Sequence, residues 1–361
     1  MHIVFVMSSL YLSGGVMLVA EYANGLAARG HTVSLVTPAA AVAPEIAAML
    51  APAVTVIEAT APFPADRAPQ TLWRLTRSLH AAIPACEVVI ATHTPTVAPV
   101  RMCGRGRCRV RGWLYMDYPE MFRGRRLESF LLTQAPRVLD LILTISQPLT
   151  DYLATRTSTP VYTIGAGLPR QEHFFDQPRL SQATTGVTPT RRVMYLGDDR
   201  PRKGLREFLD AADRVRDPIP GLHLVIASKT PCVIATQVPF DFHLHPDDAA
   251  LSALYRSSDL FVSSSWGEGL GYPPLEAMAC GTPVVLTDSS GVRDFAADGV
   301  NCLMVPPKDV PALAAAMQRV LTEPDLAARL ATGGRSTAAR YEWSSVIDRL
   351  EAALGEGLAR A

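Results

Sequence analysis

Residues 263–285 read SSSWGEGLGYPPLEAMACGTPVV and indicate a strand, a glycine-rich loop and a helix in succession. The residues up to Ser264 close an apolar run that is typical of a buried strand. Pro273 and Pro274 suit the first helical turn, where the missing N–H costs nothing, and Gly281 suits the position just past the helix end. The loop 267–271 therefore joins a strand end to a helix start, where open α/β sheets bind ligands.

Two glutamates in this segment are candidate site residues. Glu268 lies in the loop between glycines, where no structural role explains a carboxylate, and loops on a rigid sheet are where sites tend to be built. Glu276 lies in the first helical turn, where a carboxylate complements the helix dipole by about 0.3–1 kcal/mol, so its structural and functional interpretations are equally open. The backbone N–H groups of Gly269, Leu270 and Gly271 meet a helix N-terminus, which favours an anion such as a phosphate.

The rest of the chain repeats this alternation of strands and helices. Ser13-Gly14-Gly15 follows an apolar run and opens a stretch with apolar residues at helical spacing. Strands are expected at 2–7, 32–37, 54–57, 87–91, 113–116, 141–145 and 161–164, and then at 193–196, 223–227, 260–264, 283–287 and 302–305. Helices are expected between the later strands at 205–215, 249–256 and 310–321. This order predicts an α/β protein with two Rossmann-like parallel sheets in tandem, whose ligand-binding edges face an interdomain cleft.

The length of 361 residues exceeds the roughly 250–300 residues at which one hydrophobic core stops growing, so two domains are expected. The small, polar residues between Leu180 and Arg191 are typical of a linker. We therefore expect domains at 1–180 and 181–340, followed by a C-terminal helix at 341–361 that packs back on the N-terminal domain.

Lys plus Arg and Asp plus Glu both number 34, so no net field favours nucleic acid or a membrane. A local exception is the stretch Arg101 to Arg126, which is rich in arginine. One interpretation is a solvated face with a strand edge. The other is a surface that docks a phosphorylated or lipid-linked substrate, which would bring the protein into peripheral contact with a membrane. The apolar run 1–7 is too short to span a bilayer and lacks the features of a signal peptide, so we expect a cytoplasmic location, with any contact at the inner membrane face.

The six cysteines show neither the two-residue spacing nor the histidine partners of a zinc site, so they are interpreted as reduced packing residues. Cys103 and Cys108 are close enough in sequence to pair, but a reducing location disfavours a disulfide. The adjacent aspartates at 198–199 and 247–248 are interpreted as turn and helix-cap residues. We therefore expect no metal site and no cofactor.

The segment 263–285 resembles the signature of the retaining GT-B glycosyltransferases known as family 4, through Glu268, the glycine loop, Pro274, Glu276 and Gly281-Thr-Pro-Val-Val. The similarity covers nearly the whole chain and is densest from 191 to 307. It implies that Glu268 bonds sugar hydroxyls of a nucleotide-sugar donor, that the loop 269–271 holds sugar and phosphate, and that Glu276 binds the ribose. It also implies that the first domain binds the acceptor and the second the donor.

Two further elements are similar to this family. Gly14-Gly15 resembles a glycine pair that approaches the donor phosphate and the acceptor. Lys203 resembles a lysine that neutralises the diphosphate leaving group.

Two positions depart from the family pattern. Where an arginine is usual, Asp198 stands, so Arg200 or Arg202 must supply the second positive charge. We favour Arg200, because neighbouring side chains such as those of Arg202 and Lys203 tend to diverge. A histidine near the reacting sugar is also expected, but Asp117 stands after the fifth strand and is its candidate replacement. The aspartate-tyrosine pattern there resembles some bacterial rhamnosyltransferases and favours a dTDP-linked deoxysugar.

The resemblance implies transfer of a sugar from a UDP-, GDP- or dTDP-linked donor to a glycan, lipid-linked or small-molecule acceptor, with retention and without a metal. The expected catalytic residues are Asp117, Lys203 and Glu268. Another enzyme on the same twin-sheet fold, a nucleotide-sugar epimerase or a phosphorylase, is one alternative. A catalytically silent nucleotide-sugar binding module is the other, because the usual arginine and histidine are displaced.

Overall fold

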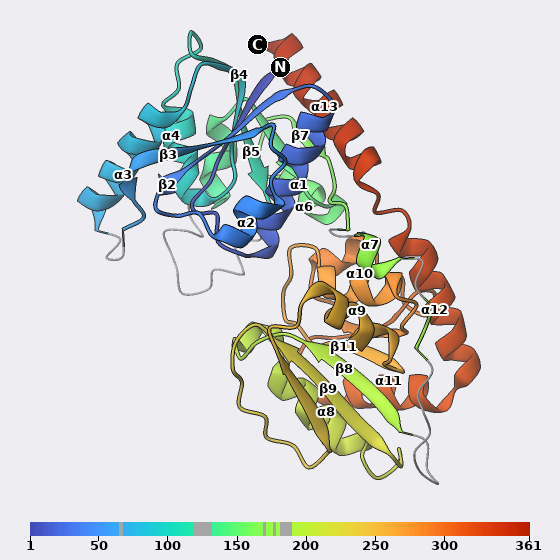
Figure 1. The fold of residues 1–361 in the computed structure, drawn as a ribbon. Helices are drawn as coiled ribbons and strands as arrows, with labels where there is room; N and C mark the ends of the chain where they lie inside the picture. The colour runs from blue at the N-terminus through green and yellow to red at the C-terminus, as the bar shows by residue number, and fades with distance from the viewer. Residues whose placement is uncertain (65–67, 118–131, 169–170, 176–177, 181–189) are drawn as a thin grey trace. The chain divides into compact units, whose positions relative to one another are not determined.

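The structure is a computed structural model that describes residues 1–64, 68–117, 132–168, 171–175, 178–180 and 190–361 (Figure 1). The chain divides into two compact units. Unit 1 comprises Met1–Pro169 and Glu342–Ala361, and unit 2 comprises Arg170–Tyr341. The expected linker at 181–189 lies outside the described residues, and the division between the units falls before the expected boundary at 180.

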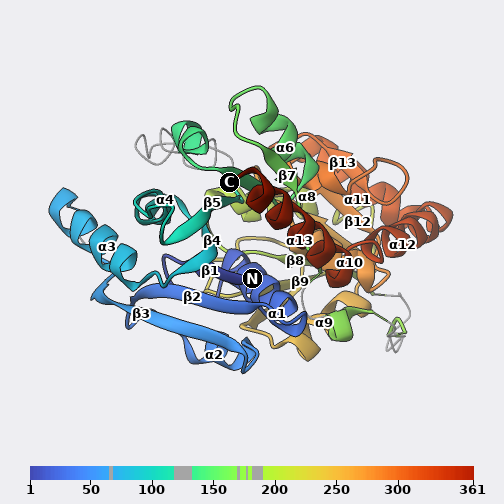
Figure 2. The same ribbon diagram turned by 90° about the horizontal axis from the view of Figure 1, so that it is seen from above.

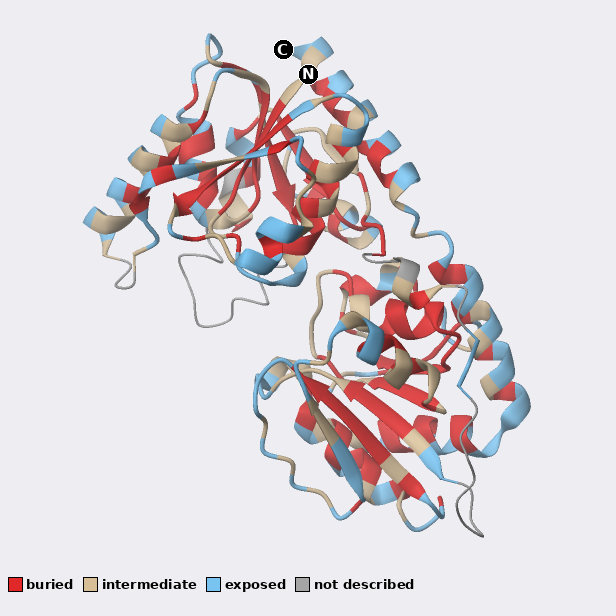
Figure 3. Cartoon of the chain, viewed as in Figure 1, coloured by how far each residue is buried: buried red, intermediate tan, exposed pale blue. Residues whose placement is uncertain are grey.

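Unit 1 is built on a seven-stranded parallel sheet in the order β3-β2-β1-β4-β5-β6-β7. Its strands are β1 (His2–Val6), β2 (Thr32–Ala39), β3 (Val54–Pro62), β4 (Cys86–Ala91), β5 (Cys108–Tyr115), β6 (Leu141–Thr144) and β7 (Val161–Thr163). The central strands are buried along most of their length, as expected for a parallel sheet covered on both faces (Figure 3).

The helices of unit 1 cover both faces of this sheet. They are α1 (Gly14–Ala28), α2 (Pro44–Met49), α3 (Pro69–Ala82), α4 (Thr94–Arg101), α6 (Gln147–Ala154) and α13 (Trp343–Arg360). Helix α3 contacts α4, while α13 runs beside α1 (Figure 2). The Trp343 indole N–H donates to the Leu168 carbonyl at 3.1 Å, and its ring packs edge-on against Tyr22. The C-terminal helix therefore belongs to the core of unit 1.

Unit 2 contains a six-stranded parallel sheet in the order β10-β9-β8-β11-β12-β13. Its strands are β8 (Arg191–Leu196), β9 (Leu222–Ser228), β10 (Phe240–Leu244), β11 (Leu260–Ser263), β12 (Val284–Thr287) and β13 (Leu303–Val305). Its α-helices are α7 (Gln171–Phe174), α8 (Leu205–Val215), α9 (Asp248–Arg256), α10 (Tyr272–Ala279), α11 (Val310–Thr322) and α12 (Pro324–Ala338). Helix α8 packs with α11, and α10 packs with α9 and α12.

The prediction of an α/β protein with two Rossmann-like parallel sheets is confirmed. The sequence interpretation missed strand β10, because Asp241 and His243 interrupt its apolar residues and the strand lies at the sheet edge, with no second neighbour to bury it. It also began β5 five residues late, because arginines alternate with apolar residues at its start.

Each sheet has a switch point, where the strand order changes direction. The switch lies between β1 and β4 in unit 1, and between β8 and β11 in unit 2. Open α/β sheets bind their ligands beyond the carboxyl ends of the strands at such points. The loops after these four strands are therefore where a site is expected.

Candidate functional site

In unit 2, the loops after β8 and β11 bring Lys203 and Glu268 into contact. The Lys203 Nζ lies 2.7 Å from Oε1 of Glu268. Both side chains are largely shielded from solvent, with 16% and 14% of their surface exposed. The two residues expected to act on the donor thus lie together at the switch point of the second sheet.

The backbone around Lys203 fixes this contact. Lys203 ends the 3-10 turn Pro201–Lys203, and its carbonyl accepts a hydrogen bond from the Tyr195 hydroxyl at 3.0 Å. Gly204 follows at φ +69°, where a Cβ would run into the Ser264 carbonyl oxygen. The backbone N–H of Trp266 donates to the Arg202 carbonyl at 2.7 Å. The loop after β8 is therefore bonded directly to the loop after β11.

The charge of Glu268 is stabilised within this contact. Burial acts to raise the pKa of Glu268, but the attraction of Lys203, followed by that of Arg202, outweighs it and holds the pKa below its usual value. Glu268 is therefore an ionised carboxylate at neutral pH, able to accept hydrogen bonds from hydroxyl groups.

The two candidate arginines have different partners. Arg200 forms a two-point bond with Asp198, at 2.8 Å and 2.6 Å, and its side chain is 57% exposed. Arg202 Nη1 lies 3.5 Å from Oε2 of Glu268 and donates to the Gly267 carbonyl at 3.2 Å. The geometry therefore brings Arg202 together with Lys203 at Glu268, whereas Arg200, which the sequence interpretation favoured, is bonded to Asp198.

The glycine loop leads into α10 as expected, with Gly271 at φ +98° directly before the helix. The second and third helical positions are Pro273 and Pro274, which have no N–H, so donors for an anion must come from the loop and from Tyr272. The loop is held by a neighbouring turn, because the Glu268 N–H donates to the Ser289 carbonyl at 2.9 Å. Gly269 and Leu270 complete the loop between these fixed points.

Glu276 is buried, with 4% of its surface exposed. The Tyr255 hydroxyl donates to its Oε2 at 2.9 Å. Buried carboxylates need such donors because desolvation of the charge is costly. The structural role of Glu276 is therefore larger than the sequence indicated, and a ribose would have to bond the carboxylate alongside Tyr255.

In unit 1, the loops after β1 and β4 bring Gly15 close to a histidine that the sequence interpretation missed. A Cβ placed on Gly15 would lie 3.7 Å from Nε2 of His93 and 3.6 Å from the Met116 methyl group. Gly14 begins α1 beside it. His93 is the second residue after β4, at the carboxyl end of the strand that neighbours β1. The resemblance implies a histidine after the fourth or fifth strand; the sequence interpretation placed that point at 115–120, although the polar Thr92-His93 pair after the fourth strand was a usable signal.

The hydrogen bonds of His93 define its state. The Thr92 hydroxyl donates to the Val6 carbonyl at 2.8 Å, so towards His93 Nδ1, 2.9 Å away, it can only accept. Nδ1 therefore carries the proton, and Nε2, which faces Gly15, is the acceptor nitrogen of the neutral ring. Burial lowers the pKa of His93 to about 4, which keeps the ring neutral at physiological pH.

Asp117 follows Met116 at the same sheet edge and is the last described residue before the gap at 118–131. Of the arginine-rich stretch, residues 101–117 are described, and three of the five arginines there, Arg105, Arg107 and Arg111, form hydrogen bonds within the protein. Arg111 bonds Asp140 twice at 2.9 Å, and Arg107 donates to the Ala81 carbonyl at 3.0 Å. The remaining arginines, at 123, 125 and 126, lie outside the described residues. The described part therefore favours the structural interpretation.

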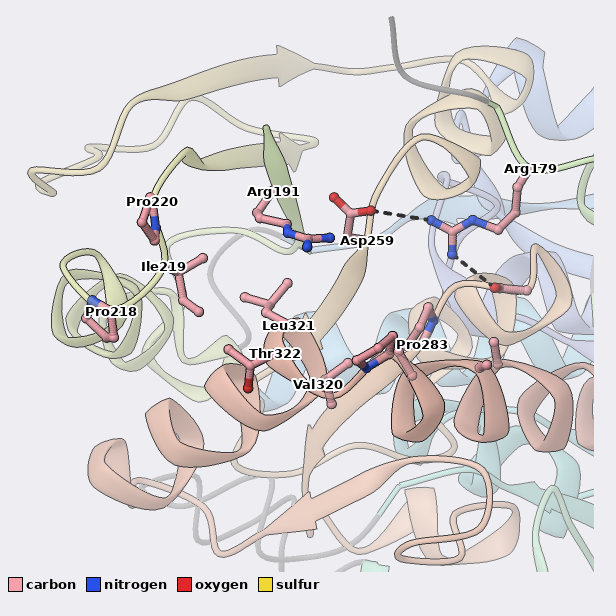
Figure 4. Close-up of a pocket in the computed structure, with 15 residues that line it drawn as sticks. Arg179, Arg191, Pro218, Ile219, Pro220, Asp259, Pro283, Val320, Leu321 and Thr322 are labelled. Atoms are coloured by element: carbon pink, nitrogen blue, oxygen red, sulfur yellow. Dashed lines mark hydrogen bonds and ion pairs between the residues drawn. The ribbon is translucent and has the colours of Figure 1, made fainter. Parts of the chain in front are cut away.

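A cavity of about 780 Å³ lies at the opposite edge of the second sheet (Figure 4). It is lined near the amino ends of β8, β11 and β12 by Arg191, Asp259 and Pro283. Arg179 points towards Asp259, and its guanidinium donates to the Ser258 carbonyl at 2.6 Å. None of the candidate site residues lines this cavity. Within the described part of the chain, no three His, Cys, Asp or Glu residues are grouped to hold a metal ion, and no helix is long and apolar enough to cross a membrane.

Comparison with known proteins finds relatives of unit 2 and of the whole fold. Residues 190–323 match the family described as glycosyl transferases group 1. The phosphatidyl-myo-inositol mannosyltransferase of Mycobacterium leprae is 33% identical over 168 residues, which are 44% of this chain and 45% of that protein. The D-inositol 3-phosphate glycosyltransferase of Stackebrandtia nassauensis is 36% identical over 110 residues, which are 30% of this chain and 25% of that protein. The matched segments thus span less than half of these curated relatives.

Solved structures share the whole fold. Sucrose-phosphate synthase from Thermosynechococcus elongatus superposes with a TM-score of 0.81 at 18% identity, covering 100% of both chains. The Anabaena protein HepE in complex with UDP and glucose superposes with a TM-score of 0.73 at 17% identity, covering 98% of this chain and 99% of that one. At such identities the likeness shows the GT-B fold alone.

Proposed function

We propose that this protein is a glycosyltransferase that moves a sugar from a nucleoside-diphosphate sugar to an acceptor hydroxyl, with retention and without a metal. The observation that carries the proposal is the contact of Lys203 with Glu268 at the switch point of the second sheet. Such a site combines a cation for a departing phosphate with a carboxylate for sugar hydroxyls. The match of residues 190–323 to glycosyl transferases group 1 supports this assignment.

In the proposed reaction, the bond between the anomeric carbon and the diphosphate oxygen breaks while the acceptor oxygen bonds the same carbon. Negative charge then grows on the diphosphate, where Lys203 and Arg202 stabilise it together with N–H groups of the loop 269–271. Glu268 holds the sugar by its hydroxyls, and Glu276 holds the ribose. The departing phosphate oxygen takes the proton of the acceptor hydroxyl, so no separate nucleophile is needed.

Gly14, Gly15, His93 and Asp117 lie at the corresponding edge of unit 1. We propose that this edge binds the acceptor, and that the neutral His93 accepts a hydrogen bond from a substrate hydroxyl through Nε2. UDP-sugars are the first donors to test, because the structurally similar HepE binds UDP and glucose. The relatives named above transfer mannose or other sugars and offer no support for a dTDP-deoxysugar.

The test is incubation of the full chain with UDP-, GDP- and dTDP-sugars, with and without candidate acceptors, while nucleoside diphosphate release is followed. If the protein transfers sugar, nucleoside diphosphate release should depend on the acceptor, and the rate should be unchanged in EDTA. Proton NMR should show an α-linked product from an α-linked donor. An epimerase would convert the donor alone without releasing nucleotide. A catalytically silent binding module would bind the nucleotide-sugar but release no nucleoside diphosphate from it.

A further inference from the structure

We propose that Cys86, Cys103 and Cys108 form an oxidisable thiol site, in which Cys86 and Cys108 join in a reversible disulfide. These three residues gather at the amino-terminal edge of β4 and β5. Gly15 and His93 lie at the carboxyl edge of the same sheet. The thiol site is thus separate from the candidate functional site and has no part in the proposed transfer.

The sheet places Cys86 and Cys108 in position to bond. They are direct partners in the register of the parallel strands β4 and β5. Neighbouring strands lie about 4.8 Å apart, which falls within the range of about 4.4–6.8 Å between the Cα atoms of a disulfide. Their sulfur atoms are already 3.2 Å apart, with the Cys86 thiol donating to the Cys108 sulfur. No backbone rearrangement is needed to bring the two sulfurs together.

The surroundings favour a thiolate on Cys108. Its sulfur accepts a hydrogen bond from Cys86, and the neighbouring Cys103 and Cys86 thiols, together with the charge of Arg107, outweigh burial and lower the pKa of the Cys108 thiol. Cys103 is buried, and its sulfur lies 3.8 Å from Nδ1 of His80. The thiolate is the nucleophile of disulfide chemistry, so Cys108 is poised to attack an oxidised neighbour.

Exposure sets the order of the steps. Cys86 is partly exposed, whereas Cys103 and Cys108 are buried, so a peroxide meets Cys86 first. The Cys108 thiolate accepts the proton of the Cys86 thiol, which already donates to it, and the resulting Cys86 thiolate attacks one oxygen of hydrogen peroxide. This gives a sulfenic acid on Cys86 and a hydroxide, which takes the proton from Cys108 and leaves as water. The Cys108 thiolate then attacks the Cys86 sulfur and displaces a second hydroxide, which forms the disulfide. In sum, one thiol and one thiolate are oxidised, and one peroxide is reduced to one water and one hydroxide.

The sequence makes the product easy to identify. Trypsin cuts after Arg77, Arg101, Arg105, Arg107 and Arg109. Each cysteine therefore falls in its own peptide, namely 78–101 for Cys86, 102–105 for Cys103 and 108–109 for Cys108. The experiment treats the full chain with hydrogen peroxide, denatures it in N-ethylmaleimide, and maps the peptides by mass spectrometry with and without dithiothreitol.

We expect a cross-link between peptides 78–101 and 108–109 that dithiothreitol removes. Of the six thiols, four should then be alkylated by N-ethylmaleimide. Cys86→Ser should abolish this cross-link, whereas the control Cys302→Ser, at a buried thiol elsewhere, should leave it intact. Six alkylated thiols after peroxide, or a cross-link that joins peptide 102–105 instead, would overturn the proposal. The wild-type peptide map decides the question even if Cys86→Ser folds poorly.

Discussion

The ammonium group of Lys203 lies 2.7 Å from a carboxylate oxygen of Glu268, although 64 residues separate them in the chain. The second oxygen of that carboxylate lies 3.5 Å from Arg202. The carboxylate thus compensates two cations that a diphosphate would otherwise attract. Donor binding is expected to divide this cluster, with the cations moving to the phosphates and the carboxylate to the sugar.

Lys203→Ala should lower turnover by about 100–1,000-fold, because the loss of one donor to a developing oxyanion typically has this effect. The substitution should also raise the pKa of Glu268, since burial then acts with one opposing cation fewer. Steady-state kinetics across pH would show the acid limb of kcat/KM moving to higher pH. Unchanged turnover, or an acid limb at the wild-type position, would count against the role of Lys203.

Arg202→Ala should lower turnover strongly, whereas Arg200→Ala should remain close to wild type. The reason is that Arg202 approaches Glu268, while Arg200 is bonded to Asp198. The double substitution Asp198→Ala with Arg200→Ala is the matched control, because it removes a neutral pair. A larger loss in Arg200→Ala than in Arg202→Ala would restore the assignment made from the sequence.

Glu276→Ala should weaken binding of the free nucleoside diphosphate, because its proposed partner is the ribose. Tyr255→Phe is the control, since it keeps the carboxylate and removes one of its hydrogen bonds. A hydrogen bond to a charged group contributes about 1.5–3 kcal/mol, so this control should lose that much free energy of unfolding in urea while still binding nucleotide. Equal nucleotide affinity of Glu276→Ala and wild type, by calorimetry, would contradict the assignment.

His93 should make stability depend on pH in acid. Burial lowers its pKa from 6.5 to about 4 in the folded protein, so between these values the unfolded chain binds a proton that the folded chain does not. Stability therefore falls as pH falls through this window. His93→Gln cannot titrate, so the difference in urea midpoint between it and wild type should change between pH 7 and pH 4. A constant difference would show that His93 is not held neutral.

The sequence predicted most of the fold because buried parallel strands are apolar runs, as in 2–6 and 284–287. It singled out Glu268 because a carboxylate in a glycine loop at a sheet edge has few structural explanations, whereas Lys203 was expected only through the family resemblance. It favoured Arg200 over Arg202, because the sequence does not show how the turn Pro201–Lys203 directs two adjacent side chains onto two oxygens of one carboxylate. Nor did it find His93, whose proximity to Gly15 follows from the neighbouring positions of β1 and β4.

Release of nucleoside diphosphate from a panel of nucleotide-sugars, compared between wild type and Glu268→Gln, tests the central claim most directly. The glutamine keeps the size of the side chain but removes the charge that pairs with Lys203 and replaces one of the two acceptor oxygens for sugar hydroxyls by an NH2 donor. We expect acceptor-dependent release by wild type, and its loss in a variant that circular dichroism shows to be folded. Full turnover in Glu268→Gln, or no release from any donor by wild type, would contradict the account.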